Sequence, residues 1–397
     1  MESRPLTIVV AGVGGYGNLY LSALLDAPDR SGFRIAGAVD PAPERCPRIA
    51  DVRAGGIPVY PSPEAFYAEH TADLAVLATP IQLHARHTRL ALERRSHVLC
   101  EKPLCATLEQ VNEMREARDR AGRLVTIGYQ WSFSEPIQTM KRDIRAGRFG
   151  RPLRFRTLSL APRGEDYYGR NDWAGAQYDR EGLPVFDSPV NNSCAHYLHN
   201  MFYVLGDRPD RSAYPAAVQA ERYRVNPIGN YDTCVLRGQT KEGVEFLFAA
   251  SHAVPRKAYR LSIRYEFENA AITYDERSAN FRAQGTDGTV TDYGRPQSWD
   301  SAAKLWHIMD CIRGGTRVLC GIEAAGAQTA CMCAVQNSAQ PIMPFSPSLV
   351  REEGESGKRL HWVEGLEAGL DQCYEKALLP SELGLEWAEC GRRTEGV

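Results

Sequence analysis

The first 130 residues alternate short apolar runs with segments of helical periodicity. Unbroken runs rich in Val, Ile, Leu and Ala predict buried strands at 6–11, 33–39, 72–78, 97–100 and 124–128. Thr107 with Gln110 forms a capping-box pattern for a helix that Gly122 ends. Because strands alternate with helices, this part of the chain predicts a parallel α/β sheet.

From residue 152 onward the pattern changes to alternating strands joined by tight turns. Strands are expected at 153–160, 231–237, 244–251, 259–267, 271–274, 281–283 and 290–293. Asp287-Gly288 is the strongest short hairpin signal, and it predicts an antiparallel sheet. Two helices, 301–311 and 322–336, are too few to cover both sheet faces, so an uncovered apolar face and self-association are expected.

A glycine-rich turn directly follows the first apolar run. Residues 12–17 read GVGGYG, in which the first glycine permits a tight turn, the second admits a pyrophosphate and the last lets a helix pack closely on the strand. The second run ends at Asp40, whose carboxylate can bind ribose hydroxyls and repel a 2′-phosphate, which favours NAD over NADP. A purely structural glycine turn is the less favoured alternative. The expected cofactor contacts are Gly12, Gly14, Gly15, Tyr16, Gly17, Asp40, Thr79, Pro80, His84, Glu101, Lys102 and Gln130.

The tetrad Cys100-Glu101-Lys102-Pro103 ends the strand predicted at 97–100. In open α/β sheets ligands bind beyond the carboxyl ends of the strands, so Lys102 is expected where cofactor meets substrate. Its bond to Pro103 can be cis, a geometry that would re-aim the lysine. His84 and His87 follow the strand at 72–78, and for His87 a solvated helix face is the favoured interpretation.

Length and motifs together divide the chain. At 397 residues it exceeds the usual size of a single core, so two domains are expected. We predict a Rossmann dinucleotide-binding domain at 1–130 and an α+β domain for substrate and oligomerisation at 131–345, with an open, mainly antiparallel sheet. Residues 346–397, with an amphipathic helix near 363–377, are expected to form an extension that packs on the body.

Composition and charge narrow the partners. A net charge of -2 with interspersed signs offers no basic stripe for a nucleic acid, and no apolar stretch is long enough for a bilayer. Without a signal region at the start of the sequence, a cytoplasmic protein is expected, with its 11 cysteines as buried thiols. Only seven of the 47 basic residues are lysines, so Lys102 stands where arginine is favoured elsewhere; unlike arginine, it can release a proton.

Polar residues cluster between 187 and 206, where the spacing from Ser193 predicts a helix that Gly206 ends. Asn192, His196 and His199 then share one face, which favours a substrate pocket over core packing. A zinc site with Cys194 is disfavoured, because the ligand spacing matches no familiar metal motif, and no metal is expected. The expected substrate contacts are Tyr168, Trp173, Asp187, Asn191, Asn192 and His199.

The GVGGYG turn followed by Asp40, the CEKP tetrad and His196 ten residues before Gly206 resemble the Gfo/Idh/MocA oxidoreductase family over about residues 6–340. The resemblance implies that Lys102 and His196 are catalytic and that the open sheet mediates homodimers or homotetramers. Two positions depart from the family pattern. Asn192 stands where the family has an aspartate, and His199 stands where an acid is usual.

The implied activity is oxidation of a secondary alcohol on a sugar, cyclitol or related polyol, with NAD as hydride acceptor. His196 suits the role of base near neutral pH, and Lys102 suits stabilisation of the reacting oxygen. Two alternatives remain open. The NAD could be recycled within one turnover to permit elimination or hydrolysis, or the chain could be a non-catalytic nucleotide and sugar sensor.

Overall fold

A computed structural model of the chain describes residues 4–275, 277–296, 301–338, 341–388 and 393–395. The chain forms two compact units. Unit 1 consists of Met1–Ser134 with Gln297–Gly326, and unit 2 of Glu135–Pro296 with Ala327–Val397. The division expected from the sequence differs at Gln297–Gly326, which it placed in the second domain, because a linear pattern does not show that the chain returns to its first unit.

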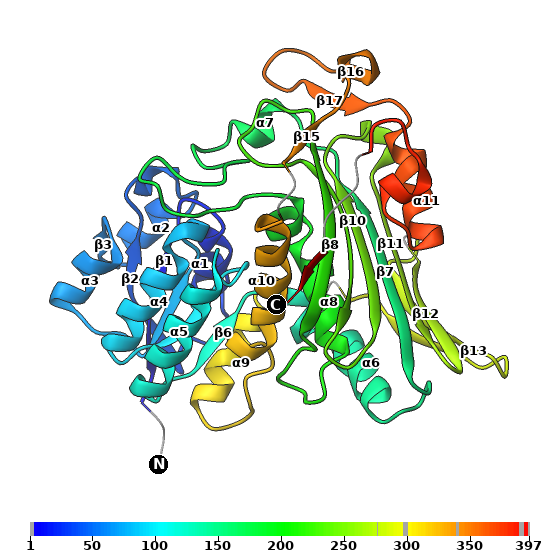
Figure 1. Cartoon of the computed structure of the whole chain (residues 1–397). Helices are drawn as coiled ribbons and strands as arrows, with labels where there is room; N and C mark the ends of the chain where they lie inside the picture. The colour runs from blue at the N-terminus through cyan, green and yellow to red at the C-terminus, as the bar shows by residue number, and fades with distance from the viewer. Residues whose placement is uncertain (1–3, 276, 297–300, 339–340, 389–392, 396–397) are drawn as a thin grey trace. The chain divides into compact units, whose positions relative to one another are not determined.

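Unit 1 is built on a parallel sheet whose six described strands have the order β3-β2-β1-β4-β5-β6 (Figure 1). The strands are β1 (Leu6–Ala11), β2 (Phe33–Val39), β3 (Val59–Tyr60), β4 (Leu74–Leu77), β5 (His97–Cys100) and β6 (Val125–Ile127). Each predicted apolar run is a strand, which confirms the Rossmann-type domain. The strand order reverses between β1 and β4, where dinucleotides bind in such sheets.

The helices of unit 1 follow its strands. They are α1 (Gly17–Leu25), α2 (Ile49–Ala54), α3 (Pro63–Glu69), α4 (His84–Glu93), α5 (Leu108–Ala121) and α9 (Ala303–Ile312), with short turns η1 (Pro43–Arg45), η2 (Ile81–Leu83) and η3 (Gln130–Phe133). Thr107 and Gln110 form the predicted capping box of α5, and Gly122, with a φ of 61°, ends that helix.

Helix α9 belongs to the core of unit 1, although it begins 176 positions after the last strand of that unit ends at Ile127. Its Leu305 and Ile308 are fully buried in one apolar cluster with Leu21 of α1 and Ile8 of β1. The return of the chain therefore completes one layer over the sheet. The neighbouring helices α4 and α5 lie side by side in Figure 1.

Unit 2 contains the second sheet, with ten described strands. They are β7 (Pro152–Leu160), β8 (Pro215–Arg224), β9 (Thr233–Thr240), β10 (Glu245–Ser251), β11 (Arg260–Phe267), β12 (Ala270–Asp275), β13 (Asn280–Gly285), β14 (Val290–Gly294), β15 (Met343–Pro344) and β18 (Arg393–Glu395). All pair antiparallel except β7 with β10 and β8 with β15. The predicted hairpins, including the one at Asp287-Gly288, are confirmed.

The other elements of unit 2 cover this sheet or border it. They are α6 (Glu135–Arg145), α7 (Glu165–Tyr168), α8 (Ala195–Val204), α11 (Leu366–Lys376), the strand pair β16 (Val350–Glu353) and β17 (Leu360–Val363), and the short turns η4 (Pro189–Ser193), η5 (Arg256–Ala258), η6 (Pro347–Leu349) and η7 (Pro380–Leu383). Helix α10 spans Ile322–Gln336, as the sequence predicted. It begins in unit 1 and ends in unit 2.

Helices α8 and α11 cover opposite faces of the second sheet (Figure 1). Successive side chains of a strand point to opposite faces. On β7, Ser159 points to the α8 side, where its hydroxyl lies 3.3 Å from the Cys194 thiol. Leu158 and Leu160 point the other way, into an apolar cluster with Leu366 of α11. The C-terminal segment thus supplies the cover of the outer face.

The expectation of an uncovered apolar face is wrong for the described part of the sheet. Helix α11 covers the apolar strip, and beyond it the outer face carries polar side chains along β11. Glu266 pairs there with Arg156 at 2.7 Å and with Arg264 at 2.8 Å. The expectation rests on the helices at 301–311 and 322–336 and omits α11. That helix lies in the C-terminal segment 346–397 but forms a layer on the sheet.

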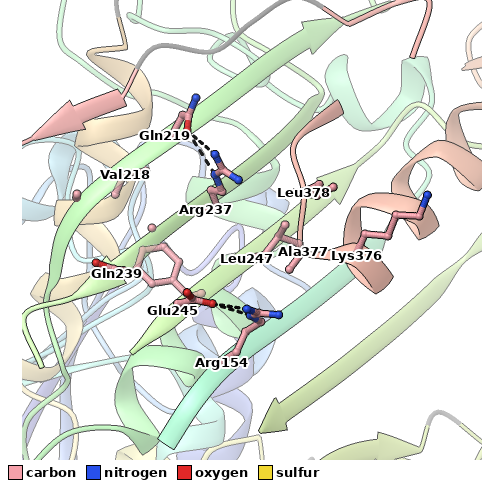
Figure 2. A pocket seen from close by; sticks show the side chains of 13 residues that line it. Arg154, Val218, Gln219, Arg237, Gln239, Glu245, Leu247, Lys376, Ala377 and Leu378 are labelled. Carbon is pink, nitrogen blue, oxygen red and sulfur yellow. Dashed lines mark hydrogen bonds and ion pairs between the residues drawn. The ribbon is translucent and has the colours of Figure 1, made fainter. Parts of the chain in front are cut away.

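A hollow of about 400 Å³ lies on the same outer face beside the end of α11 (Figure 2). A charge pair and a polar contact border it. Arg154 Nε donates to the Glu245 carboxylate at 2.7 Å, and Arg237 donates to the neutral side-chain oxygen of Gln219 at 3.0 Å. Lys376 of α11 also lines it. Such charged and polar side chains are typical of a solvated surface and not of an apolar docking face.

The ten cysteines within the described residues are buried and form no disulfide, which confirms their prediction as small buried thiols. Among the same residues, no helix has both the length and the apolarity needed to cross a bilayer. The last cysteine, Cys390, lies outside the described residues.

Candidate functional site

The glycine turn after β1 has the geometry that its sequence requires. Gly12 has a φ of 84°, and a Cβ at that position would lie 2.3 Å from the Ala78 carbonyl oxygen of the neighbouring strand end. A Cβ on Gly17 would lie 2.6 Å from the Gly12 carbonyl oxygen. Only glycine therefore allows this turn and the start of α1 to approach the sheet edge.

Asp40 lies against the glycine turn. Its Oδ2 accepts a hydrogen bond from the Gly14 amide at 2.8 Å, and its Oδ1 accepts one from Ala42 at 2.9 Å. The predicted phosphate loop and the predicted ribose acid are thus brought together. A Cβ on Gly15 would make only an ordinary contact, 3.8 Å from the Gly12 carbonyl oxygen, and Tyr16 beside it is 45% exposed. These features fit a dinucleotide with its pyrophosphate at the turn and its adenosine ribose at Asp40.

The loop after β4 is tied to the tetrad through His84. The ring places Nε2 at 2.8 Å from the Thr79 carbonyl oxygen and Nδ1 at 2.7 Å from the Pro103 carbonyl oxygen. Burial lowers the pKa of His84, although the two carbonyls act in the opposite direction. Two of the predicted cofactor residues, Thr79 and His84, therefore meet directly, and Pro80 follows within the same loop. The predicted cis bond between Lys102 and Pro103 is confirmed.

The interpretation of His87 as part of a solvated helix face is wrong. Its side chain is only 6% exposed, and Nδ1 lies 3.1 Å from the Thr79 hydroxyl. Burial lowers the pKa of His87 to about 4. Helix periodicity alone did not show that this side of α4 is packed within the unit.

Glu101 of the tetrad is held by a buried lysine that sequence analysis did not identify. Lys304 Nζ of α9 lies 2.5 Å from Glu101 Oε1 and 3.1 Å from the Gly128 carbonyl oxygen. The Tyr20 hydroxyl of α1 donates to the same carboxylate, whose Oε2 accepts from the Lys102 amide at 3.1 Å. Although burial acts to raise it, the Lys304 ammonium holds the pKa of Glu101 below its ordinary value.

The scarcity of lysines, which drew attention to Lys102, is a signal that would also have singled out Lys304. The backbone of the Lys102 segment is thus fixed by a charge pair inside unit 1. Gln130, another predicted cofactor contact, lies in the turn η3 and is partly buried.

In unit 2, Asp187 organises the predicted substrate residues. Its Oδ1 accepts a hydrogen bond from the Asn192 side-chain amide at 2.7 Å, and its Oδ2 accepts one from the Gly175 amide at 2.6 Å. A guanidinium nitrogen of Arg170 lies 3.5 Å from Oδ2. A buried carboxylate thus stands next to Asn192, the position at which the family has its aspartate.

The three residues predicted to share a helix face do not do so. Asn192 belongs to the turn η4, and Cys194, with φ -108° and ψ 7°, separates that turn from α8. His196, the second residue of α8, is partly exposed. His199 is 1% exposed and stacks on Tyr203 at 5.3 Å, so it packs in the interior of unit 2 and we do not retain it as a substrate contact.

Tyr168 is linked to Ser193 through a histidine that no sequence pattern marked. His252, which follows β10, places Nδ1 at 2.8 Å from the Tyr168 hydroxyl and Nε2 against the Ser193 hydroxyl. Trp173 comes five residues after Tyr168 in the chain, and the Arg170 guanidinium carbon lies 5.3 Å from the centroid of its ring. Asn191 is fully buried, and its amide donates to the Val185 carbonyl at 3.1 Å, which is a structural contact.

Within the residues that the structure describes, no group of three or more His, Cys, Asp or Glu side chains could hold an ion. Each unit thus has its own group of candidate residues: unit 1 has a dinucleotide turn with a fixed lysine segment, and unit 2 has a polar cluster around Asp187.

Comparison with known proteins gives a family-model match for the first unit. Residues 6–129 match the GFO_IDH_MocA model, described as an oxidoreductase family with an NAD-binding Rossmann fold. Unit 1 is therefore an NAD-binding Rossmann domain, which confirms the predicted cofactor. The match to this oxidoreductase family covers residues 6–129 and so concerns unit 1.

Two relatives indicate the range of this family. The chain is 32% identical over 147 residues to inositol 2-dehydrogenase 1 of Mycolicibacterium vanbaalenii, covering 37% of this chain and 42% of the relative. It is 24% identical over 234 residues to D-glucoside 3-dehydrogenase of Escherichia coli K12, covering 59% and 62%. The match thus spans less than two thirds of either relative.

The complete fold is also known. The WlbA dehydrogenase of Bordetella pertussis, solved with NADH and UDP-GlcNAcA, superposes with a TM-score of 0.69 at 21% identity, covering 85% of this chain and 97% of that one. At this identity the likeness concerns the fold, and it confirms a Rossmann domain followed by a mainly antiparallel sheet domain.

Proposed function

We propose that the protein is an NAD-dependent dehydrogenase that transfers a hydride between a secondary alcohol of a sugar, cyclitol or related polyol and nicotinamide. The observation that carries this proposal is the Lys102 segment at the carboxyl edge of an NAD-binding sheet, fixed through Glu101 by the buried Lys304. The names of the relatives, which are dehydrogenases of inositol and of a glucoside, support a ring hydroxyl as the reacting group.

The choice of NAD over NADP is assigned to Asp40. Its carboxylate lies beside Gly14, where the adenosine ribose is expected, and a 2′-phosphate there would meet a negative charge. Pro41 follows it and offers no compensating cation. Two amide donors hold the carboxylate, so it cannot turn away without breaking both hydrogen bonds.

The catalytic roles follow from the chemistry of the side chains. Bound NAD supplies the hydride acceptor. His196, partly exposed near the start of α8, is assigned the role of base that takes the hydroxyl proton. Lys102 is assigned the stabilisation of negative charge that develops on the reacting oxygen. Asn192, held by Asp187, is assigned to orient a substrate hydroxyl.

Absorbance of reduced nicotinamide tests the proposal against its alternatives. Purified protein is incubated with a panel of polyols and with NAD or NADP separately, and products are analysed in parallel. Accumulation of reduced nicotinamide with one of the polyols supports the dehydrogenase. Product without accumulation indicates an internally recycled cofactor, and binding without product indicates a sensor.

Self-association into a dimer or tetramer, which the family resemblance implies, remains part of this proposal. The apolar strip on the outer face of the second sheet is covered by α11 within the chain, so we assign self-association to other surfaces. Light scattering at micromolar concentration measures the mass directly. A monomer mass would contradict the assignment.

A further inference from the structure

Two arginines of unit 2 share one aromatic ring between β7 and the turn η4. The Arg170 guanidinium carbon lies 3.7 Å from the centroid of the Tyr167 ring, and that of Arg163 lies 5.0 Å from it. A guanidinium that stacks on an aromatic ring keeps its N–H donors at the edge, where a planar or tetrahedral anion can accept two of them at once. The ring therefore orients two cations without neutralising them.

Within the described residues, a carboxylate pairs with only one of these two guanidinium groups, that of Arg170. Among the described residues Arg163 forms no ion pair; it donates to the Pro162 carbonyl at 3.3 Å, and its buried Nε has no hydrogen-bond partner. The acid nearest to Arg170 is Asp187 at 3.5 Å, and that carboxylate already accepts two shorter hydrogen bonds.

The arginines are also connected to the residues proposed to meet substrate. Arg170 reaches Asn192 through the shared carboxylate of Asp187. Burial first, and then the charges of Arg163 and Arg170, lower the pKa of His252 well below its ordinary value, so both charges act near the start of α8. The segment that carries Asn192 and His196 therefore lies within the positive field of this pair.

We propose that Arg163 and Arg170 form a subsite for an anionic group, a carboxylate or a phosphate, on the sugar or polyol substrate. This inference rests on the proposed function and adds the charge of the substrate to it. The sugar ring would then extend from the arginines towards Asn192 and His196.

Matched pairs of substrates test the subsite. Initial rates are compared for glucose, glucuronate and glucose 6-phosphate, and for myo-inositol and its monophosphate. We expect kcat/KM to be at least about tenfold higher for an anionic member than for its neutral counterpart, and the KM of the anion to rise with ionic strength. The ratio of glucuronate to glucose 6-phosphate then distinguishes carboxylate from phosphate. Equal or better turnover of the neutral members would overturn the proposal without any variant.

Variants locate the effect. Arg163→Met and Arg170→Met should each raise the KM of the anion roughly tenfold to a hundredfold more than the KM of its neutral counterpart. Arg180→Met is the matched control, because Arg180 is an exposed arginine of the same segment that pairs with Asp172 at 3.6 Å. An equal loss for neutral and anionic substrates in the two test variants would show a structural role.

Calorimetric binding separates this inference from the proposed function. Glucuronate and glucose 6-phosphate are titrated into the wild type and the arginine variants in the presence of NAD. Binding that depends on the arginines but yields no reduced nicotinamide would leave the subsite standing and remove the dehydrogenase. Turnover of neutral polyols without measurable binding of either anion would leave the dehydrogenase standing and remove the subsite.

Discussion

Lys304 and Glu101 form a buried charge pair, with Nζ and Oε1 2.5 Å apart, although 203 positions separate them in the chain. Their side chains are only 1% and 8% exposed. The same carboxylate accepts the amide proton of Lys102. The helix that returns to unit 1 late in the sequence therefore fixes the segment that carries the proposed catalytic lysine.

Removal of this pair's positive charge should destabilise unit 1. Lys304→Met leaves Glu101 buried without compensation, for which a cost of about 3–5 kcal/mol in the free energy of unfolding is expected. Urea unfolding followed by circular dichroism measures it. Glu101→Gln combined with Lys304→Met should recover much of the loss, because the buried charge is then gone as well. Wild-type stability of the single variant would contradict this role.

The same pair predicts a pH dependence with a definite sign. Lys304 holds the pKa of Glu101 below its ordinary value, so the stabilisation is present above about pH 4.3 and is lost as the pH falls. The difference in stability between wild type and Lys304→Met should therefore shrink on acidification below about pH 4. A constant difference between pH 7 and pH 3 would be incompatible with an ionised Glu101.

Asp40 should control the preference between the two nicotinamide cofactors. Asp40→Asn keeps acceptor capacity towards Gly14 and removes the charge, so the ratio of NADP to NAD affinity should rise on the order of tenfold. Asp40→Ala should narrow the gap as well, with an additional loss from the freed amides. Fluorescence titration with both reduced cofactors measures the ratios, and Glu44→Ala on the exposed turn nearby is the control. A wild type that prefers NADP would contradict the assignment of Asp40 as the residue that selects NAD.

Lys102 and His196 should behave as one catalytic unit. Lys102→Met should lower kcat on the order of a hundredfold and leave NAD affinity nearly intact, since the lost interaction is made in the transition state. His196→Ala should lower kcat by a similar factor. The double variant should lower kcat by less than the product of the two single factors. Steady-state rates with the best substrate measure all three. Full activity of Lys102→Met would show that the chemistry lies elsewhere.

Asn192 should set the pH range of turnover. In Asn192→Asp a second carboxylate would favour the protonated form of a nearby imidazole, so the alkaline rise of kcat/KM should move to higher pH. Asn192 Nδ2 lies 2.7 Å from Asp187 Oδ1, so this variant also brings two carboxylates together. The double variant Asn192→Asp/Asp187→Asn is the matched control, because it carries a single carboxylate at these two positions. An unshifted profile in both variants would remove His196 as the base.

Buried neutral histidines should make the fold sensitive to mild acid. Burial lowers the pKa of His87 and of His97 to about 4, whereas an unfolded histidine titrates near about 6.5. Below about pH 6.5 these imidazoles are protonated in the unfolded chain but stay neutral in the folded chain. Acidification therefore favours the unfolded state, and Tm should fall between pH 7 and pH 5. His87→Gln should flatten this fall and the exposed His70→Gln should not. A Tm that is level over this range would contradict the buried neutral state.

The sequence determined the parts of this protein that depend on neighbours along the chain. Strands of unit 1, the GVGGYG turn with Asp40 and the hairpin at Asp287-Gly288 all followed from periodicity and turn chemistry, because each involves residues close in sequence. The tertiary structure decided what depends on packing between distant segments. It buried His87, turned His199 into the interior and brought Lys304 to Glu101, and it placed α11 over the second sheet. The physical reason is that a residue's type limits its possible contacts, while the face of each helix that is buried depends on which distant element packs against it.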